Sequence, residues 1–413
     1  MLHQRQKYTK PMILWSVTTL FFAFQFILRL SAGILREEIM HRFSIDTLSF
    51  GTLAGYYYLG YAGMQIPFGI MLDRLNFKLV TSSAILLSVI GTTTFVLADS
   101  WNLVLLGRFL IGAGSGVGFL AVAKVIKLFF AEKYHAFMIG FAFTFGLIGA
   151  VFGGTPMKII FEEVGYDLTF ICLALVGIFI AILLLFAPSP KLQNAQYSSS
   201  VNFTQIRKLF FHPIIISTGI GGGLLVGPLE GFADVWAMPF FQHIHNFSIN
   251  DSIFVSSLVF FGMCCGGPLL AYFAKLLDSN IAIIVLCGIC TIAVFSIILF
   301  SNLSFIGACV LMFILGILCC YQVLVFAFAS NLVEKSQTGI AIAIINCINM
   351  SFGHFFHKVI SVNMNYYWSG LTTNSGFPIY SQTDFLYGLG IIPLGCFVGV
   401  IIFLVVQLKS KKI

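Results

Sequence analysis

Apolar stretches about as long as a bilayer is thick recur along the whole sequence, and they constrain the fold more than any other feature. A helix needs about 20 apolar residues to cross the hydrocarbon core of a membrane. The stretches lie at residues 12–35, 48–72, 78–98, 102–123, 136–160, 167–187, 213–238, 252–274, 281–300, 304–329, 339–360 and 384–408. Their length and continuity predict twelve membrane-spanning helices rather than the short alternating strands of a barrel.

The composition favours the same class of protein. Charged residues make up only 9% of the chain and hydrophobic residues 59%, whereas a soluble domain has about 25% charged residues. The ten cysteines lie mostly within apolar runs and lack the spacing of a zinc site, so we interpret them as packing residues and expect no metal. No Walker-type loop is present, and we expect no cofactor. The sequence therefore predicts an all-α integral membrane protein.

The distribution of lysine and arginine predicts the orientation, because basic residues gather on the cytoplasmic side. With the N-terminus inside, the inner segments contain Arg5, Lys7, Lys10, Arg74, Lys78, Lys124, Lys127, Lys133, Lys191, Arg207, Lys208, Lys275, Lys335, Lys409, Lys411 and Lys412. The outer loops contain only Arg36 and Arg42. We expect both termini in the cytoplasm and the protein in a plasma (inner) membrane. The net charge of +7 then reflects topology and not nucleic-acid binding.

A polar, serine-rich segment divides the chain in the middle. Residues 188–212 are predicted to form a cytoplasmic linker, with a short amphipathic helix at 203–211 lying on the membrane. The linker separates an N-terminal six-helix bundle, residues 1–187, from a C-terminal six-helix bundle, residues 213–413.

The turn between the second and third spans carries the sequence GIMLDRLNFK, residues 69–78. It is similar to a loop signature of the form G-x-L-x-D-R-x-G-R-R: Gly69, Asp73 and Arg74 match, and Lys78 keeps the last base. Asn76 stands where the signature has glycine. A residue without a side chain lets another helix approach closely, and an acid at this edge can face the positive N-terminus of a helix.

Two further glycine-rich motifs accompany this loop. RFLIGAGSGVG, residues 108–118, lies on the fourth span, and GAVFGG, residues 149–154, lies on the fifth. Together with the layout of twelve spans, these motifs resemble the major facilitator superfamily. Ala150 replaces a proline that the antiporters of that family have, which counts against antiport.

The resemblance implies two six-helix bundles that alternately open a central site to either side of the membrane. It also implies that Asp73 contacts the start of the eleventh span, near Thr338 and Gly339, and so favours the state closed to the cytoplasm. The alternative is that Asp73 and Arg74 are solvated charges that only set the topology.

Ionisable residues within spans are costly and by default indicate function. Gln25 and Arg29 lie one turn apart on the first span, and Arg108 lies on the fourth. Glu230 and Asp234 lie one turn apart on the seventh span, just after Gly227-Pro228, where we expect a kink or an opened backbone. All four charges lie in the predicted outer half, which allows a cluster of two bases and two acids around one cavity.

Each charge has a functional and a structural interpretation. The guanidinium of Arg29 suits a carboxylate or phosphate, so we interpret it as a substrate anchor, and we interpret Glu230 as the proton carrier. Arg108 and Asp234 are assigned to substrate binding and proton coupling respectively, although a static salt bridge between the halves is the alternative.

Polar stripes on other spans are candidates for the wall of the cavity. Tyr57 and Tyr61 repeat at four-residue spacing on the second span, and Asn346 and Asn349 share a face of the eleventh. Packing and hydrogen bonding between helices are the alternative roles.

The leading hypothesis is a secondary active transporter, not an enzyme, that moves a small anionic or zwitterionic organic solute by alternating access and proton-coupled symport. Its expected partners are the solute, protons and the lipid bilayer, and we expect a monomer. The alternatives are proton-coupled efflux of a drug or metabolite, a transporter-like sensor, and a membrane enzyme that uses His243 and His245.

Overall fold

The computed structural model describes residues 2–188, 203–333, 337–372, 378 and 380–410. These residues form helices and no named strand, with one isolated bridge between Thr372 and Pro378. Most of the predicted linker, residues 189–202, lies outside the described residues, so its interpretation stays a prediction. The predicted amphipathic segment is confirmed as a helix, α10 (Phe203–Phe210).

The chain divides into two compact units. The first contains residues 1–29 and 59–206, and the second contains residues 30–58 and 207–413. Three of the described helices contribute to both units: α1 (Leu2–Ile34), α3 (Thr47–Arg74), and α10, which is divided between Ile206 and Arg207. The other helices of the first unit are α4 (Phe77–Leu97), α5 (Trp101–Ser115), α6 (Gly118–Phe129), α7 (Glu132–Phe152), α8 (Thr155–Val164) and α9 (Tyr166–Phe186).

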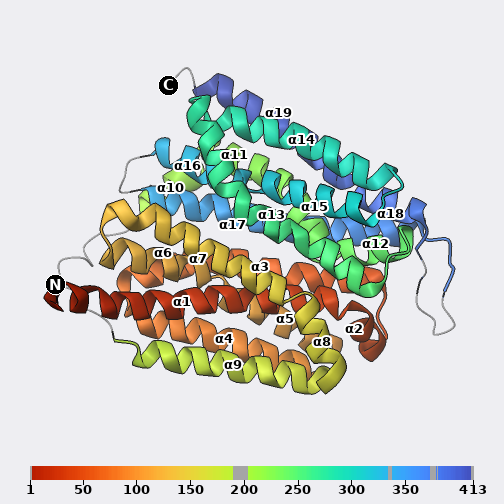
Figure 1. The fold of residues 1–413 in the computed structure, drawn as a ribbon, viewed down its shortest axis with the longest axis horizontal. Helices are drawn as coiled ribbons and strands as arrows, with labels where there is room; N and C mark the ends of the chain where they lie inside the picture. Colours follow the sequence, from red (N-terminus) through yellow and green to blue (C-terminus); the bar gives the residue numbers. More distant parts are fainter. Residues whose placement is uncertain (1, 189–202, 334–336, 373–377, 379, 411–413) are drawn as a thin grey trace. The chain divides into compact units, whose positions relative to one another are not determined.

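In the first unit, α4 packs between α5 and α9, and it lies beside α9 in Figure 1. Small residues bring α4 and α5 together, because a Cβ on Gly107 would lie 2.7 Å from the backbone nitrogen of Phe95. Close approach of this kind is how helices associate in lipid, where burial of apolar surface gives no advantage.

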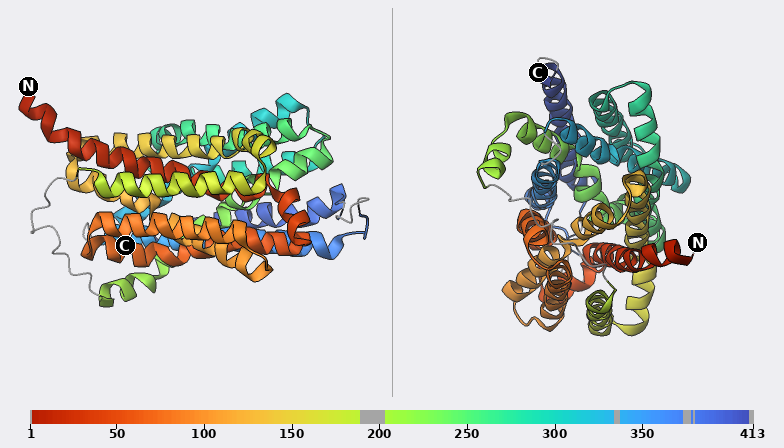
Figure 2. Two further views of the ribbon diagram at one scale, coloured as in Figure 1. Left: turned by 90° about the horizontal axis from the view of Figure 1, so that it is seen from below. Right: turned by 90° about the vertical axis from the view of Figure 1, so that its left-hand side faces the viewer.

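The second unit contains α2 and the helices of the C-terminal half of the chain. They are α2 (Arg36–Phe43), α11 (Pro213–Leu225), η2 (Gly227–Ala233), α12 (Ala237–Ile244), α13 (Ile249–Leu276), α14 (Asn280–Phe300), α15 (Phe305–Cys319), α16 (Tyr321–Asn331), α17 (Thr338–Tyr367), α18 (Gln382–Leu389) and α19 (Ile391–Ser410). Helix α11 packs against α17 and α19, and α13 packs against α15. Within each unit the axes of the long helices are roughly parallel to one another (Figure 2).

The predicted count of twelve spans is not confirmed in full. Among the described residues, nine helices are long and apolar enough to cross a membrane, and the number rises to eleven if two bent pairs each count as one span. Helix α3 is absent from this set because its tyrosines and glycines lower its hydropathy. Its 28 residues would still extend about 42 Å at 1.5 Å per residue, which exceeds the roughly 30 Å of a hydrocarbon core.

Two predicted spans, among the described residues, bend by more than 40° at a break. Helix α7 bends by 41° into α8 at Gly153-Gly154, and α11 bends by 43° into η2. Gly227 and Pro228 begin η2, which is a π-helix. The kink predicted at this pair is thereby confirmed. Because Pro228 lacks an N–H, the backbone pairing of a regular α-helix is interrupted immediately before the two acids.

Candidate functional site

The two acids of the seventh span meet at one tyrosine. Glu230 and Asp234 are 1% and 6% exposed, and both carboxyl groups lie at hydrogen-bond distance from the hydroxyl of Tyr58. The prediction that the two acids share a face is therefore confirmed. Tyr58 comes from α3, so this contact joins the second predicted span to the seventh within the second unit.

Tyr58 is fixed by its neighbours on α17. Its ring centroid lies 5.4 Å from that of His357, a fully buried residue. A Cβ on Gly353 would collide with the Tyr58 ring, so only glycine leaves room for it at that position. These contacts hold the tyrosine ring while its hydroxyl contacts the acids, and a larger residue at 353 would displace the ring.

Two glycines bring α3 against α17 beside this tyrosine. A Cβ on Gly51 would lie 2.8 Å from the carbonyl oxygen of His357, and one on Gly55 would lie 3.2 Å from Cε1 of His354. Gly51 and Gly55 form a G-x-x-x-G pattern, the sequence signal that indicates close helix contact and that the sequence analysis missed. We call these contacts between residues 30–58 and the C-terminal helices the seam.

Arg36 forms a second part of the seam. The Arg36 guanidinium lies over the rings of Phe50, 5.8 Å from the centroid, and Trp236, 5.7 Å away, and it donates a hydrogen bond of 3.1 Å to Thr47. Burial lowers the pKa of Arg36. Sequence reasoning treated Arg36 as an outer-loop charge, because a sequence does not show that a cation is enclosed by aromatic rings.

Arg108, predicted to bind substrate, donates hydrogen bonds to the backbone of α1. It is 3% exposed, and its guanidinium donates hydrogen bonds of 2.8 Å to the carbonyl of Leu28 and 2.6 Å to the carbonyl of Arg29. These contacts lie within the first unit and hold the peptide that carries Arg29. Arg29 and Gln25 are also buried, and the Arg29 guanidinium lies 5.5 Å from the Phe26 ring.

The predicted meeting of Arg29 and Arg108 with Glu230 and Asp234 concerns both units, so it stays a prediction. The same holds for the predicted contact of Asp73 with Thr338 and Gly339.

Two side chains of the loop signature make contacts within the first unit. Asp73 forms an ion pair with Lys124 of α6, and Lys78 donates to the carbonyl oxygens of Leu185, at 3.1 Å, and Ala187. A Cβ on Gly69 would meet no described atom of the first unit within 4 Å, and the close helix approach expected there stays a prediction.

Asn76 explains the departure from the signature. Its side chain accepts hydrogen bonds from the backbone of Lys78, at 3.0 Å, and Leu79, at 3.3 Å, and so caps the N-terminus of α4.

The asparagines of α17 differ in burial. Asn349 is fully buried, and among the described residues neither its oxygen nor its nitrogen has a hydrogen-bond partner, whereas Asn346 is half-buried. A buried amide without partners costs about 1–3 kcal/mol, so Asn349 is suited to a polar ligand or water. Tyr57 and Tyr61 are buried as well, at 1% and 8% exposure.

The histidines of the enzyme alternative lie at the end of α12. His245 packs among the rings of Phe240, Phe241 and Phe247, and burial lowers its pKa and that of His243. Within the described part of the chain, no group of three or more His, Cys, Asp or Glu residues is placed to hold a metal ion.

The sequence model of a family described as the Major Facilitator Superfamily matches residues 14–356. The fold is similar to that of a bacterial homologue of the human lysosomal transporter Spinster in an inward-facing and occupied conformation, with a TM-score of 0.74, 18% identity and 97% of each chain covered. It is also similar to the nucleoside transporter NupG, with a TM-score of 0.71, 13% identity, and 96% of this chain and 99% of that chain covered.

Two curated proteins of Escherichia coli (strain K12) are related in sequence. The L-fucose-proton symporter is 27% identical over 121 residues, which are 29% of this chain and 28% of that protein. The putative transporter AraJ is 25% identical over 241 residues, which are 57% of this chain and 59% of that protein. The matches thus span less than two thirds of either relative.

Proposed function

Because the chain belongs to the major facilitator superfamily, whose members are multi-pass membrane transporters, we propose that it moves a small anionic or zwitterionic organic solute together with protons. The observation that carries this proposal is the buried pair of acids, Glu230 and Asp234, joined by the hydroxyl of Tyr58. The relative named as a proton symporter supports symport over antiport.

The hydrogen count at this tyrosine supports a role for protons. A phenol carries one hydrogen and donates one full hydrogen bond, so a second bond to the same oxygen needs a hydrogen from a protonated carboxyl group. The arrangement therefore favours one proton shared by the acid pair. Within the second unit, Cys319 of α15 and Tyr321 of α16 lie close enough to Glu230 to interact with it electrostatically. Other charged or titratable groups of the seam include His354, His357 and Lys358 on α17 and Arg36 on α2.

The solute is proposed to bind through groups that have hydrogen-bonding capacity to spare or a fixed charge. Asn349 supplies a buried amide, and Arg29 supplies a guanidinium that matches a carboxylate or phosphate. Gln25, Tyr57, Tyr61 and Asn346 are proposed to line the same site. The role of Arg108 is to hold the α1 backbone that carries Arg29, which is supported by its two hydrogen bonds.

The seam is proposed to close the outer side of the transporter. Alternating access then requires the contacts of α3 with η2 and α17 to break when that side opens. Loss of the shared proton weakens the bond between Tyr58 and the acids, which links opening to proton release. The loop containing Gly69, Asp73, Arg74 and Lys78 is proposed to gate the opposite, cytoplasmic side. The protein is also proposed to be a monomer in a plasma (inner) membrane, with both termini in the cytoplasm.

Flux measurements with the purified protein in liposomes test the proposal. An inward pH gradient is imposed, and solutes from panels of sugars, nucleosides, amino acids and organic acids are supplied in turn. We expect one class of solute to accumulate inside the liposomes while a trapped pH-sensitive dye reports that their interior becomes more acidic. Accumulation without acidification would contradict symport, and binding without any flux would identify a sensor.

A further inference from the structure

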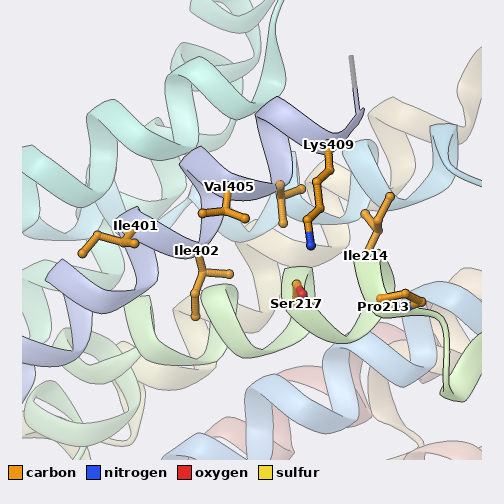
Figure 3. Close-up of a pocket in the computed structure, with 8 residues that line it drawn as sticks. Pro213, Ile214, Ser217, Ile401, Ile402, Val405 and Lys409 are labelled. Carbon is orange, nitrogen blue, oxygen red and sulfur yellow. The ribbon is translucent and has the colours of Figure 1, made fainter. Parts of the chain in front are cut away.

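A cavity of about 150 Å³ lies between α11 and α19 in the second unit. Its walls are mostly apolar and include Ile214, Ile402 and Val405. Figure 3 shows the side chain of Lys409 pointing from α19 toward α11 and Ser217. Of the described residues that line the cavity, Lys409 alone is charged.

The cavity lies beside a surface that faces lipid. Along α19, the side chains of Ile401, Leu404, Val405 and Leu408 are 44%, 43%, 45% and 68% exposed. Exposed aliphatic side chains on a helix that crosses a membrane contact acyl chains. An engineered apolar cavity of about 150 Å³ holds a benzene molecule, so a cavity of this size admits part of one lipid molecule.

Several exposed basic residues lie at this end of the helices. No carboxylate among the described residues forms an ion pair with Lys409, which is exposed in the last turn of α19. Arg207 and Lys208, also exposed, lie in the last turn of α10, shortly before Pro213, which lines the cavity. Basic residues gathered beside the end of a membrane-spanning helix attract anionic headgroups.

We propose that this cavity binds an anionic phospholipid. The end of an acyl chain or the glycerol contacts the walls formed by Ile214, Ile402 and Val405, and the phosphate contacts the amine of Lys409 and the hydroxyl of Ser217. The apolar walls have no favourable interaction with a free phosphate ion. A zwitterionic lipid carries a cationic group that the amine of Lys409 repels. The site is distinct from the acid pair and binds a component of the bilayer that is not transported.

Native mass spectrometry of the full-length protein in detergent tests this assignment, with phosphatidylglycerol and phosphatidylcholine of identical acyl chains as probes. We expect the wild-type protein to bind phosphatidylglycerol more tightly. Lys409→Gln should reduce that preference about fivefold, the effect expected of one basic residue near a lipid surface, and leave phosphatidylcholine binding unchanged. Ser217→Met fills the cavity without a change of charge and should weaken the binding of both lipids.

Lys275→Gln is the matched control, because Lys275 is an exposed lysine in the last turn of α13 and does not line this cavity. It should keep the wild-type preference. The proposal is overturned if Lys409→Gln keeps the full preference, if Lys275→Gln loses as much, or if Ser217→Met binds both lipids normally. Displacement of phosphatidylglycerol by inorganic phosphate would show an ion site and would equally overturn it.

Discussion

Replacing Glu230 by glutamine is expected to abolish proton-driven accumulation of the solute while solute exchange continues. Glutamine keeps the size of the protonated carboxyl and its bond with Tyr58, but it has no proton to release. One pH unit corresponds to about 1.36 kcal/mol, so a gradient of that size and one coupled proton drive about tenfold accumulation. In liposomes the wild-type ratio should approach this value, and the variant ratio should stay near one.

The hydroxyl of Tyr58 gives this prediction its control. Tyr58→Phe keeps the ring against His357 and removes the bond to the acids, so it should reduce coupling more than Tyr56→Phe, which changes a half-buried neighbour on the same helix. If the Glu230→Gln protein accumulates solute as well as the wild type, Glu230 is not the proton carrier. If the variant loses both solute exchange and solute accumulation, the carboxylate of Glu230 binds the solute.

Replacing Arg108 by glutamine is expected to destabilise the first unit. The guanidinium makes two hydrogen bonds to carbonyls of α1, and a hydrogen bond from a charged group contributes about 1.5–3 kcal/mol. Loss of both removes about 3–6 kcal/mol, and at about 2–4 °C per kcal/mol for a unit of this size it predicts a fall in Tm of about 6–24 °C. Thermal unfolding of the purified protein, measured by intrinsic fluorescence, checks this value.

A second readout separates the two roles considered for Arg108. Arg42 is exposed, so Arg42→Gln should change stability by at most about 0.5 kcal/mol. If Arg108→Gln leaves the Tm unchanged and abolishes solute binding, the guanidinium contacts the solute and our account of its structural role is wrong. A lower Tm with measurable solute binding supports that account.

The spans could be predicted from sequence because hydrophobic length is a local property. Each predicted stretch overlaps a helix or a broken helix, and the kink at Gly227-Pro228 followed from the geometry of proline. The spacing of Glu230 and Asp234 placed both acids on one side of their helix, since a turn of helix separates them. Features that depend on residues close together in sequence could therefore be predicted.

The residues that these side chains contact in the fold could not be predicted from the sequence. The stripe of Tyr57 and Tyr61 was recognised by its period, yet the acids meet Tyr58, which points from another side of α3 and is 172 residues away from Glu230 in sequence. Periodicity tells which residues share a face but not which helix that face meets. The charge of Arg108 likewise did not reveal that its partners are main-chain carbonyls, because every residue has one.

The most direct test of the account is a reversible link across the seam. Lys358 of α17 donates a hydrogen bond of 3.1 Å to Thr52 of α3, so cysteines at these two positions, in a protein without its ten native cysteines, can be bridged by a short reducible bis-thiosulfonate reagent. If the seam must open in every cycle, the bridge will stop solute uptake in liposomes, and reduction will restore it. Uptake by the bridged protein at the rate of the unbridged one would contradict the account.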